Sequence, residues 1–187
     1  MKTNRTWQRT QTGAYLVEHR DPDGRLHRDG APARILDAPN DYTREQQWFR
    51  HGVLHHDGGP ATLRGTDNAS HADTALWYRN NEQHREGGPA AVWRDGTGEP
   101  IREEWWRGNK RHRDDGPAVI WLIDGRGEMD WWKNGEPYAP SAHERLAWAK
   151  IQATRGGPFF PEAPVAFHRE IARPARVQRA RRFEPVL

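Results

Sequence analysis

Apolar positions along the chain are few and lie in short runs that Gly, Pro, Asp and Asn separate. The clearest runs cover residues 118–123 and 128–132, and each is followed by a turn pair, Asp124-Gly125 or Asn134-Gly135. Short runs rich in β-branched and aromatic side chains predict strands and not helices. Asp-Gly and Asn-Gly adopt the positive φ angles of tight hairpin turns, so these segments predict β-hairpins. The corresponding turns elsewhere are Asp23-Gly24, Asp95-Gly96 and Gly108-Asn109.

One phrase recurs along the chain and defines a repeat. It consists of a histidine, an acidic residue two positions later and a proline three positions after that. The histidines, spaced by 28, 29 and 28 residues, are His27, His55, His84 and His112, and the prolines are Pro32, Pro60, Pro89 and Pro117. A second phrase, two aromatic residues and a basic one, precedes the last three copies and occurs again at residues 131–133. Such a fixed period is typical of stacked repeat architectures.

We therefore expect an all-β repeat domain over residues 1–140. It should be an antiparallel meander or solenoid of stacked β-hairpins with about 28 residues per unit. The expected units lie near residues 15–38, 39–66, 67–95 and 96–123, with a partial unit at 124–140. The first unit lacks the aromatic pair and the last lacks the histidine, as expected of capping units.

The aromatic pairs predict two rows of side chains, because neighbouring residues of a strand point to opposite sides. One row comprises Trp48, Trp77, Trp105 and Trp131. The other comprises Phe49, Tyr78, Trp106 and Trp132. With ten Trp residues and only 34% hydrophobic residues, one row is expected to form an internal spine. The second row either packs under a flanking segment or faces solvent, and with Arg79 and Arg107 it forms the candidate partner-binding set.

At these residues the chain resembles the MORN-type repeat proteins, especially bacterial and phage variants. The matching pieces are residues 77–80, residues 132–135 and the Gly-Pro-Ala phrases, and the resemblance covers roughly residues 15–140. It implies an elongated or curved sheet of stacked hairpins that serves protein or lipid contacts, and some bacterial members are antitoxin-like. The chain departs from the family in its longer unit and in the inserted histidine phrase.

The histidine phrase also raises the question of catalysis. His55 and Asp57, like His112 and Asp114, lie two residues apart, as a base and its orienting carboxylate or a metal ligand and its partner can. A metal held by His71, His84 and His112 is a further alternative. A catalytic site is normally unique, whereas this phrase recurs at each unit, so a hydrogen-bonded structural ladder is favoured. No catalytic, cofactor or metal-binding residue is therefore predicted.

Residues 141–187 predict a short helix and a tail. Ser141 and Glu144 form a capping box, Gly156 ends the helix, and Leu146 and Trp148 should dock it on the last unit. Residues 158–164 either pack along the repeats, which is favoured, or form a recognition peptide. This region carries five more basic than acidic residues, and its tail arginines could bind a polyanion. These are Arg169, Arg173, Arg176, Arg179, Arg181 and Arg182.

The favoured function is a non-enzymatic protein-binding repeat scaffold, such as an inhibitor, an antitoxin or a phage counter-defence protein. The alternatives are a nucleic-acid-binding protein that uses the arginine tail, and a hydrolase or metal protein that uses one histidine–acid pair. There is no cysteine, which excludes a disulfide framework and a Cys nucleophile. There is also no long apolar run and no apolar segment near Met1, so a cytoplasmic protein without a membrane span is expected.

Overall fold

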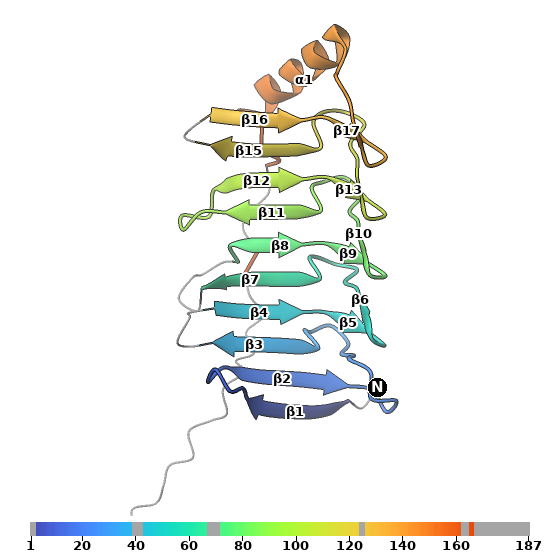
Figure 1. Ribbon diagram of the computed structural model, residues 1–187, viewed down its shortest axis with the longest axis vertical. Coiled ribbons are helices and arrows are strands. Elements are labelled where there is room, and N and C mark those ends of the chain that lie inside the picture. Colours follow the sequence, from blue (N-terminus) through green and yellow to red (C-terminus); the bar gives the residue numbers. More distant parts are fainter. Residues whose placement is uncertain (1–2, 39–42, 67–71, 124–125, 162–164, 167–187) are drawn as a thin grey trace, which may run out of the picture.

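The computed structural model describes residues 3–38, 43–66, 72–123, 126–161 and 165–166. Within these residues, ten strands pair antiparallel as successive neighbours in one open sheet (Figure 1). In order across the sheet they are β1 (Asn4–Arg9), β2 (Tyr15–Arg20), β3 (Arg34–Ala38), β4 (Thr43–Gln47), β7 (Thr62–Thr66), β8 (Thr74–Leu76), β11 (Ala91–Arg94), β12 (Pro100–Glu104), β15 (Val119–Ile123) and β16 (Arg126–Asp130). The all-β meander of consecutive hairpins is confirmed.

Four short ribbons stand beside this sheet in the described part of the chain and stack on one another along one side (Figure 1). They are β5 (Phe49–Arg50) with β6 (Val53–Leu54), β9 (Tyr78–Arg79) with β10 (Glu82–Gln83), β13 (Trp106–Arg107) with β14 (Lys110–Arg111), and β17 (Trp132–Lys133) with β18 (Glu136–Pro137). Both central residues of each ribbon turn have positive φ, for example 54° at Asn134 and 88° at Gly135. Such turns are of type I′, whose twist suits a two-residue hairpin.

A tryptophan links the sheet to the ribbon in the three units where the aromatic pair precedes the histidine. The Trp105 N–H donates to the Ala118 carbonyl in the sheet at 2.8 Å, and the Trp105 carbonyl accepts from the His112 N–H at 3.0 Å. Trp48 and Trp77 make the same two contacts in their own units. The tryptophan therefore ends the sheet ladder and begins the ribbon.

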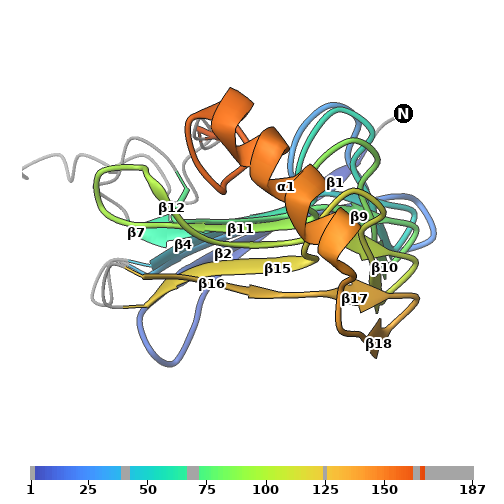
Figure 2. The ribbon, with the colours of Figure 1, turned by 90° about the horizontal axis from the view of Figure 1, so that it is seen from above.

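A buried row crosses the sheet, with one residue from each strand between β2 and β15. Its members, aligned by the strand register, are Val17, Ile35, Gln46, Leu63, Ala75, Val92, Glu103 and Ile120. None of these side chains is more than 3% exposed. Helix α1 (Ala142–Arg155) lies on the same side of the sheet (Figure 2), where Trp148 packs against Met129 and Ile120.

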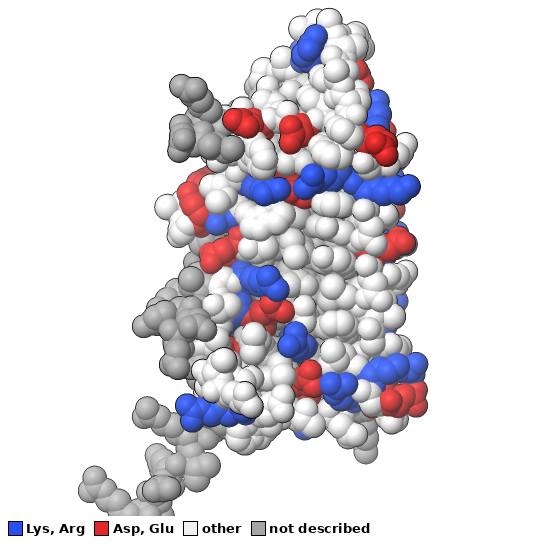
Figure 3. Space-filling view, in the orientation of Figure 1, with Lys and Arg blue, Asp and Glu red and all other residues white. Residues whose placement is uncertain are grey.

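The opposite face of the sheet, toward the viewer in Figure 3, carries charged residues of both signs among uncharged ones. Arg20 pairs with Glu18 at 2.6 Å, and Arg64 pairs with Glu45 at 2.5 Å. The guanidinium of Arg102 lies 5.0 Å from the ring centres of both Trp93 and Trp121. Interspersed ion pairs and cation–π stacks suit a solvated face.

Three local predictions are wrong. The strand expected at residues 128–132 is β16, which ends at Asp130, because Trp131 is the link residue and Trp132 belongs to the ribbon. In the turn after β11, the positive φ belongs to Gly98 and not to Asp95-Gly96. Leu146 does not dock α1, since its side chain is 58% exposed. The turn at Asp124-Gly125 lies outside the described residues.

Other local predictions are confirmed. Ser141 and Glu144 form the reciprocal capping box at the start of α1, and Gly156 ends the helix with φ 77°. The tryptophans Trp48, Trp77 and Trp105 form the internal row, since they are 7, 7 and 8% exposed. Trp131, their equivalent in the partial last unit, is only half-buried.

Candidate functional site

Three of the repeated histidines, His27, His55 and His112, connect their unit to the next one. The Nδ1 atom of His55 accepts a hydrogen bond from the backbone N–H of Asn80, a turn residue of the following ribbon, at 3.2 Å. His27 and His112 accept in the same way from the turn residues His51 and Asn134, at 3.3 and 3.1 Å. Because Nδ1 accepts, the ring proton of the neutral imidazole lies on Nε2. Each of these histidines is therefore a link between units.

The Nε2 atoms of His55 and His112 bind the acidic residue of their own unit. The distance is 2.7 Å from His55 to Asp57 and 3.1 Å from His112 to Asp114. The arginine in the ribbon of that unit also pairs with the carboxylate. The Arg107 guanidinium, for example, lies 2.7 Å from the Asp114 carboxylate. The hydrogen bond from His55 lowers the pKa of Asp57 below its ordinary value. For Asp114, hydrogen bonds from Arg107 and then from the histidine lower the pKa.

In the three units that contain a spine tryptophan, the residue after the histidine covers that tryptophan. The guanidinium of Arg113 lies 3.8 Å from the ring centre of Trp105, and that of Arg85 lies 4.0 Å from the ring centre of Trp77. In the second unit, a histidine replaces the arginine and its ring stacks on the tryptophan at 5.0 Å. The same side chains bind the carbonyl of the repeat proline, as Arg113 does at Pro117 at 3.2 Å. These side chains line the loop between each repeated histidine and its proline.

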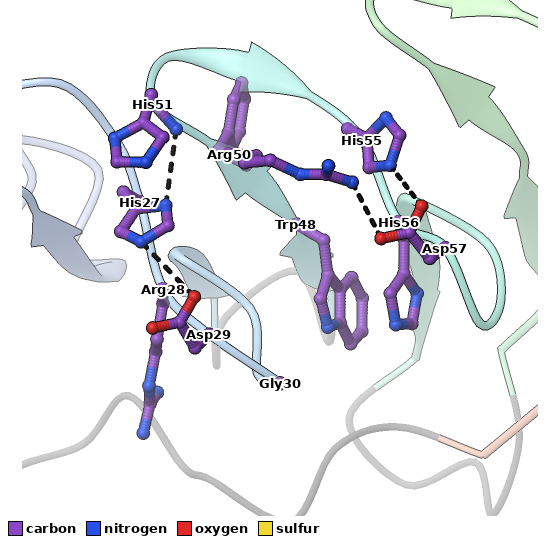
Figure 4. Close-up of a pocket in the computed structure, with 11 residues that line it drawn as sticks. His27, Arg28, Asp29, Gly30, Trp48, Arg50, His51, His55, His56 and Asp57 are labelled. Carbon is purple, nitrogen blue, oxygen red and sulfur yellow. Dashed lines mark hydrogen bonds and ion pairs between the residues drawn. The ribbon is translucent and has the colours of Figure 1, made fainter. Parts of the chain in front are cut away.

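We call residues 27–32, 55–60, 84–89 and 112–117 the His-Pro loops. Between successive His-Pro loops lie three grooves of about 370, 580 and 330 Å³, numbered here from the N-terminus. Figure 4 shows the first groove, with Trp48 at its base between two pairs of histidine and acid. Each groove is lined by a spine tryptophan, the aromatic residue after it and the next arginine. These triplets are Trp48, Phe49 and Arg50, then Trp77, Tyr78 and Arg79, then Trp105, Trp106 and Arg107.

The segment after α1 packs on the side of the sheet that carries these grooves. Phe160 lines the third groove together with Arg155, and Val165 lines the second. The Phe160 N–H donates to both carboxylate oxygens of the buried Glu103, at 3.0 and 2.9 Å. The favoured prediction that residues 158–164 pack along the repeats therefore holds for the described residues 158–161, and residues 162–164 lie outside the described ranges.

Five of the six candidate partner-binding residues line the grooves. Phe49, Tyr78 and Trp106 are half-buried, and Arg79 and Arg107 are 62 and 58% exposed at the rims. Trp132 is apart from them, in a hollow between the third and fourth ribbons. The arginines proposed to bind a polyanion, from Arg169 to Arg182, lie outside the described residues.

Within the described ranges, no three His, Asp or Glu side chains gather closely enough to hold a metal ion. His71, one member of the proposed histidine set, lies outside those ranges.

One equivalence escaped the sequence reasoning. His19 occupies the place of the spine tryptophan in the first unit, where its N–H donates to the Ala33 carbonyl at 2.7 Å and its carbonyl accepts from His27. The spacing did not reveal this equivalence, because His19 precedes the repeated histidine of its unit by one residue more than each spine tryptophan precedes its own.

The chain matches no protein-family model, no curated protein and no solved structure at a significant level. The resemblance to MORN-type repeats therefore stays a prediction. In the described part of the chain, α1 is too short and too polar to cross a membrane.

Proposed function

We propose that the chain is a non-enzymatic protein-binding repeat scaffold whose row of grooves receives a segment of another protein. The observation that carries the proposal is the repetition of one groove in three successive units, each with a tryptophan at its base and an arginine at its rim. Trp, Tyr and Arg are the residues enriched at interface hot spots. Two strands per unit place equivalent contacts ~10 Å apart, so a single extended partner segment can reach several grooves.

The hydrogen bonding of the histidines supports a structural role for the histidine–acid pairs. In His55 and His112, Nδ1 accepts from a backbone N–H and Nε2 faces a carboxylate, so both ring nitrogens are engaged. A general base must instead present a nitrogen to the substrate proton. The Nδ1 contact recurs at His27, His55 and His112, which suits a ladder better than a single reaction centre.

The proposal is tested by affinity capture from lysate of the source cells, after nuclease treatment, with the full chain as bait. We expect wild type to retain a defined protein and an Arg79→Glu/Arg107→Glu variant to retain at least tenfold less of it, because both rims change sign. An Arg145→Glu/Lys150→Glu variant is the matched control, since both side chains are exposed on α1. Equal retention by the groove variant and wild type would contradict the proposal. Loss of all captured protein on nuclease treatment would instead favour nucleic-acid binding.

A further inference from the structure

The third groove differs from the other two in its charge. Among the described residues, two arginines and two acidic residues line the first groove, and the second groove has the same balance. Four arginines and three acidic residues line the third. The additional arginine is Arg155, which belongs to the last turn of α1 and not to the repeat. The helix therefore adds one positive charge to a groove that the repeat alone would leave balanced.

The acidic residues that line the third groove already have arginine partners of their own. These ion pairs are Asp114 with Arg107 at 2.7 Å, Asp115 with Arg113 at 2.7 Å and Glu86 with Arg79 at 3.4 Å. In contrast, the Nη1 atom of Arg155 is shielded from solvent and has no hydrogen-bond acceptor among the described residues. The unbalanced positive charge of the third groove therefore lies at Arg155.

The surroundings of Arg155 are aromatic. Its guanidinium lies 5.4 Å from the ring centre of Phe160 and 5.9 Å from that of Trp148. A second guanidinium, that of Arg113, lies 4.5 Å from the same Trp148 ring centre. Burial lowers the pKa of Arg113, and the positive charge of Arg155 acts in the same direction. Two like charges therefore lie among apolar rings, where a cation without an acceptor is unfavourable and an added anion is stabilising.

The charge balance of the groove indicates which anion fits. A carboxylate carries one negative charge and can accept two parallel hydrogen bonds from a guanidinium, so it matches the single unbalanced charge. A phosphate monoester carries about two negative charges, and a nucleic-acid strand carries one at every phosphate. The three acidic residues around the groove would repel that excess. A single carboxylate is therefore favoured over a polyanion.

We propose that the third groove receives an acidic side chain of the partner segment, whose carboxylate binds Arg155. This assignment rests on the proposed function and names the chemistry of one partner residue. An acidic residue at this groove fixes the register of a segment that spans several grooves, because the first and second grooves lack the additional charge. The helix α1 thus makes the third groove different from its repeat equivalents.

The first test selects random dodecapeptides displayed on phage against the full-length protein. Among peptides retained by wild type, we expect Asp or Glu to be enriched at one aligned position. An Arg155→Gln variant should select peptides without that preference. Lys150→Gln is the matched control, because it removes the same charge from an exposed position of the same helix and should keep the preference. No acidic preference with wild type, or the same preference with Arg155→Gln, would overturn the proposal.

The second test uses the most enriched peptide and a copy in which Gln replaces its acidic residue. The Gln copy should bind wild type about tenfold more weakly, because a charge-assisted hydrogen bond is lost. Both peptides should bind Arg155→Gln equally, since the coupling between the two groups is then already absent. An equal loss of affinity with wild type and Arg155→Gln would show that the acidic residue binds elsewhere, and would overturn the assignment.

Single-stranded RNA of twelve nucleotides serves as the competitor in the same binding assay. We expect it to leave the peptide bound. Displacement of the peptide by RNA at a lower concentration than by unlabelled peptide would overturn the choice of a protein carboxylate. If the acidic preference is absent while the groove-rim variant still loses the captured protein, the inference fails and the protein-binding function stands.

Discussion

Trp77→Ala tests most simply whether the tryptophan row is the spine of the repeat. Trp77 is 7% exposed and packs in a buried cluster with Trp48, Leu63 and Val92. Truncation of a buried large aromatic residue costs about 3–5 kcal/mol. The stacked guanidinium of Arg85 adds an interaction of about 1 kcal/mol that the variant also loses. We therefore expect the free energy of unfolding to fall by about 4 kcal/mol.

The assay is urea unfolding followed by far-UV circular dichroism, with Trp7→Ala as the matched control. Trp7 lies in β1 and is 56% exposed, so its replacement should change stability by less than about 0.5 kcal/mol. The reasoning would be refuted if Trp77→Ala unfolded at the same urea concentration as Trp7→Ala. The internal spine would then have to be sought elsewhere in the sheet.

Three further predictions concern the loops and their links. Gly116→Ala should lower the free energy of unfolding by about 1–3 kcal/mol, because the added Cβ would overlap the Trp148 ring. Thermal unfolding measures this loss, and a melting temperature equal to that of wild type would mean that α1 does not dock there. His55→Ala and His112→Ala should each cost about 1–3 kcal/mol, because each leaves a backbone N–H without its acceptor; sharply unequal costs would speak against a shared structural role. A hydrogen bond from the His51 imidazole lowers the pKa of Asp21 to about 2. The stabilising contribution of the Asp21 carboxylate should therefore be present above about pH 4 and lost as the pH falls toward 2. Urea midpoints measured across that range should therefore fall less steeply for Asp21→Asn than for wild type, and parallel curves would refute the linkage.

Much of the fold could be predicted because its signals are local. The period of the histidine phrase and the β-branched runs gave the meander, and residues with positive φ gave the ribbon turns. The capping box at Ser141 and the glycine at 156 fixed both ends of α1 for the same reason, since each motif acts within one turn of helix.

Features that depend on contacts between distant segments were missed or misplaced. Ribbon strands of two residues are too short to show any alternation, so the link at Trp131 was taken as part of a strand. Leu146 follows the expected helical pattern, but α1 docks mainly through Trp148 against a loop glycine, which needs no broad apolar stripe. The grooves exist only because loops 28 or 29 residues apart stack side by side, and no single segment of the sequence encodes them.

The central claim, that the row of grooves binds a protein, is tested most directly by photo-crosslinking. A photoreactive phenylalanine analogue would replace Tyr78, at the second groove, in the full chain, and Leu146, exposed on α1, would carry it in a matched control. The account predicts a crosslink from position 78 to one protein, and none to that protein from position 146. Crosslinks to the same protein from position 146 alone, or crosslinks from position 78 only to nucleic acid, would contradict it.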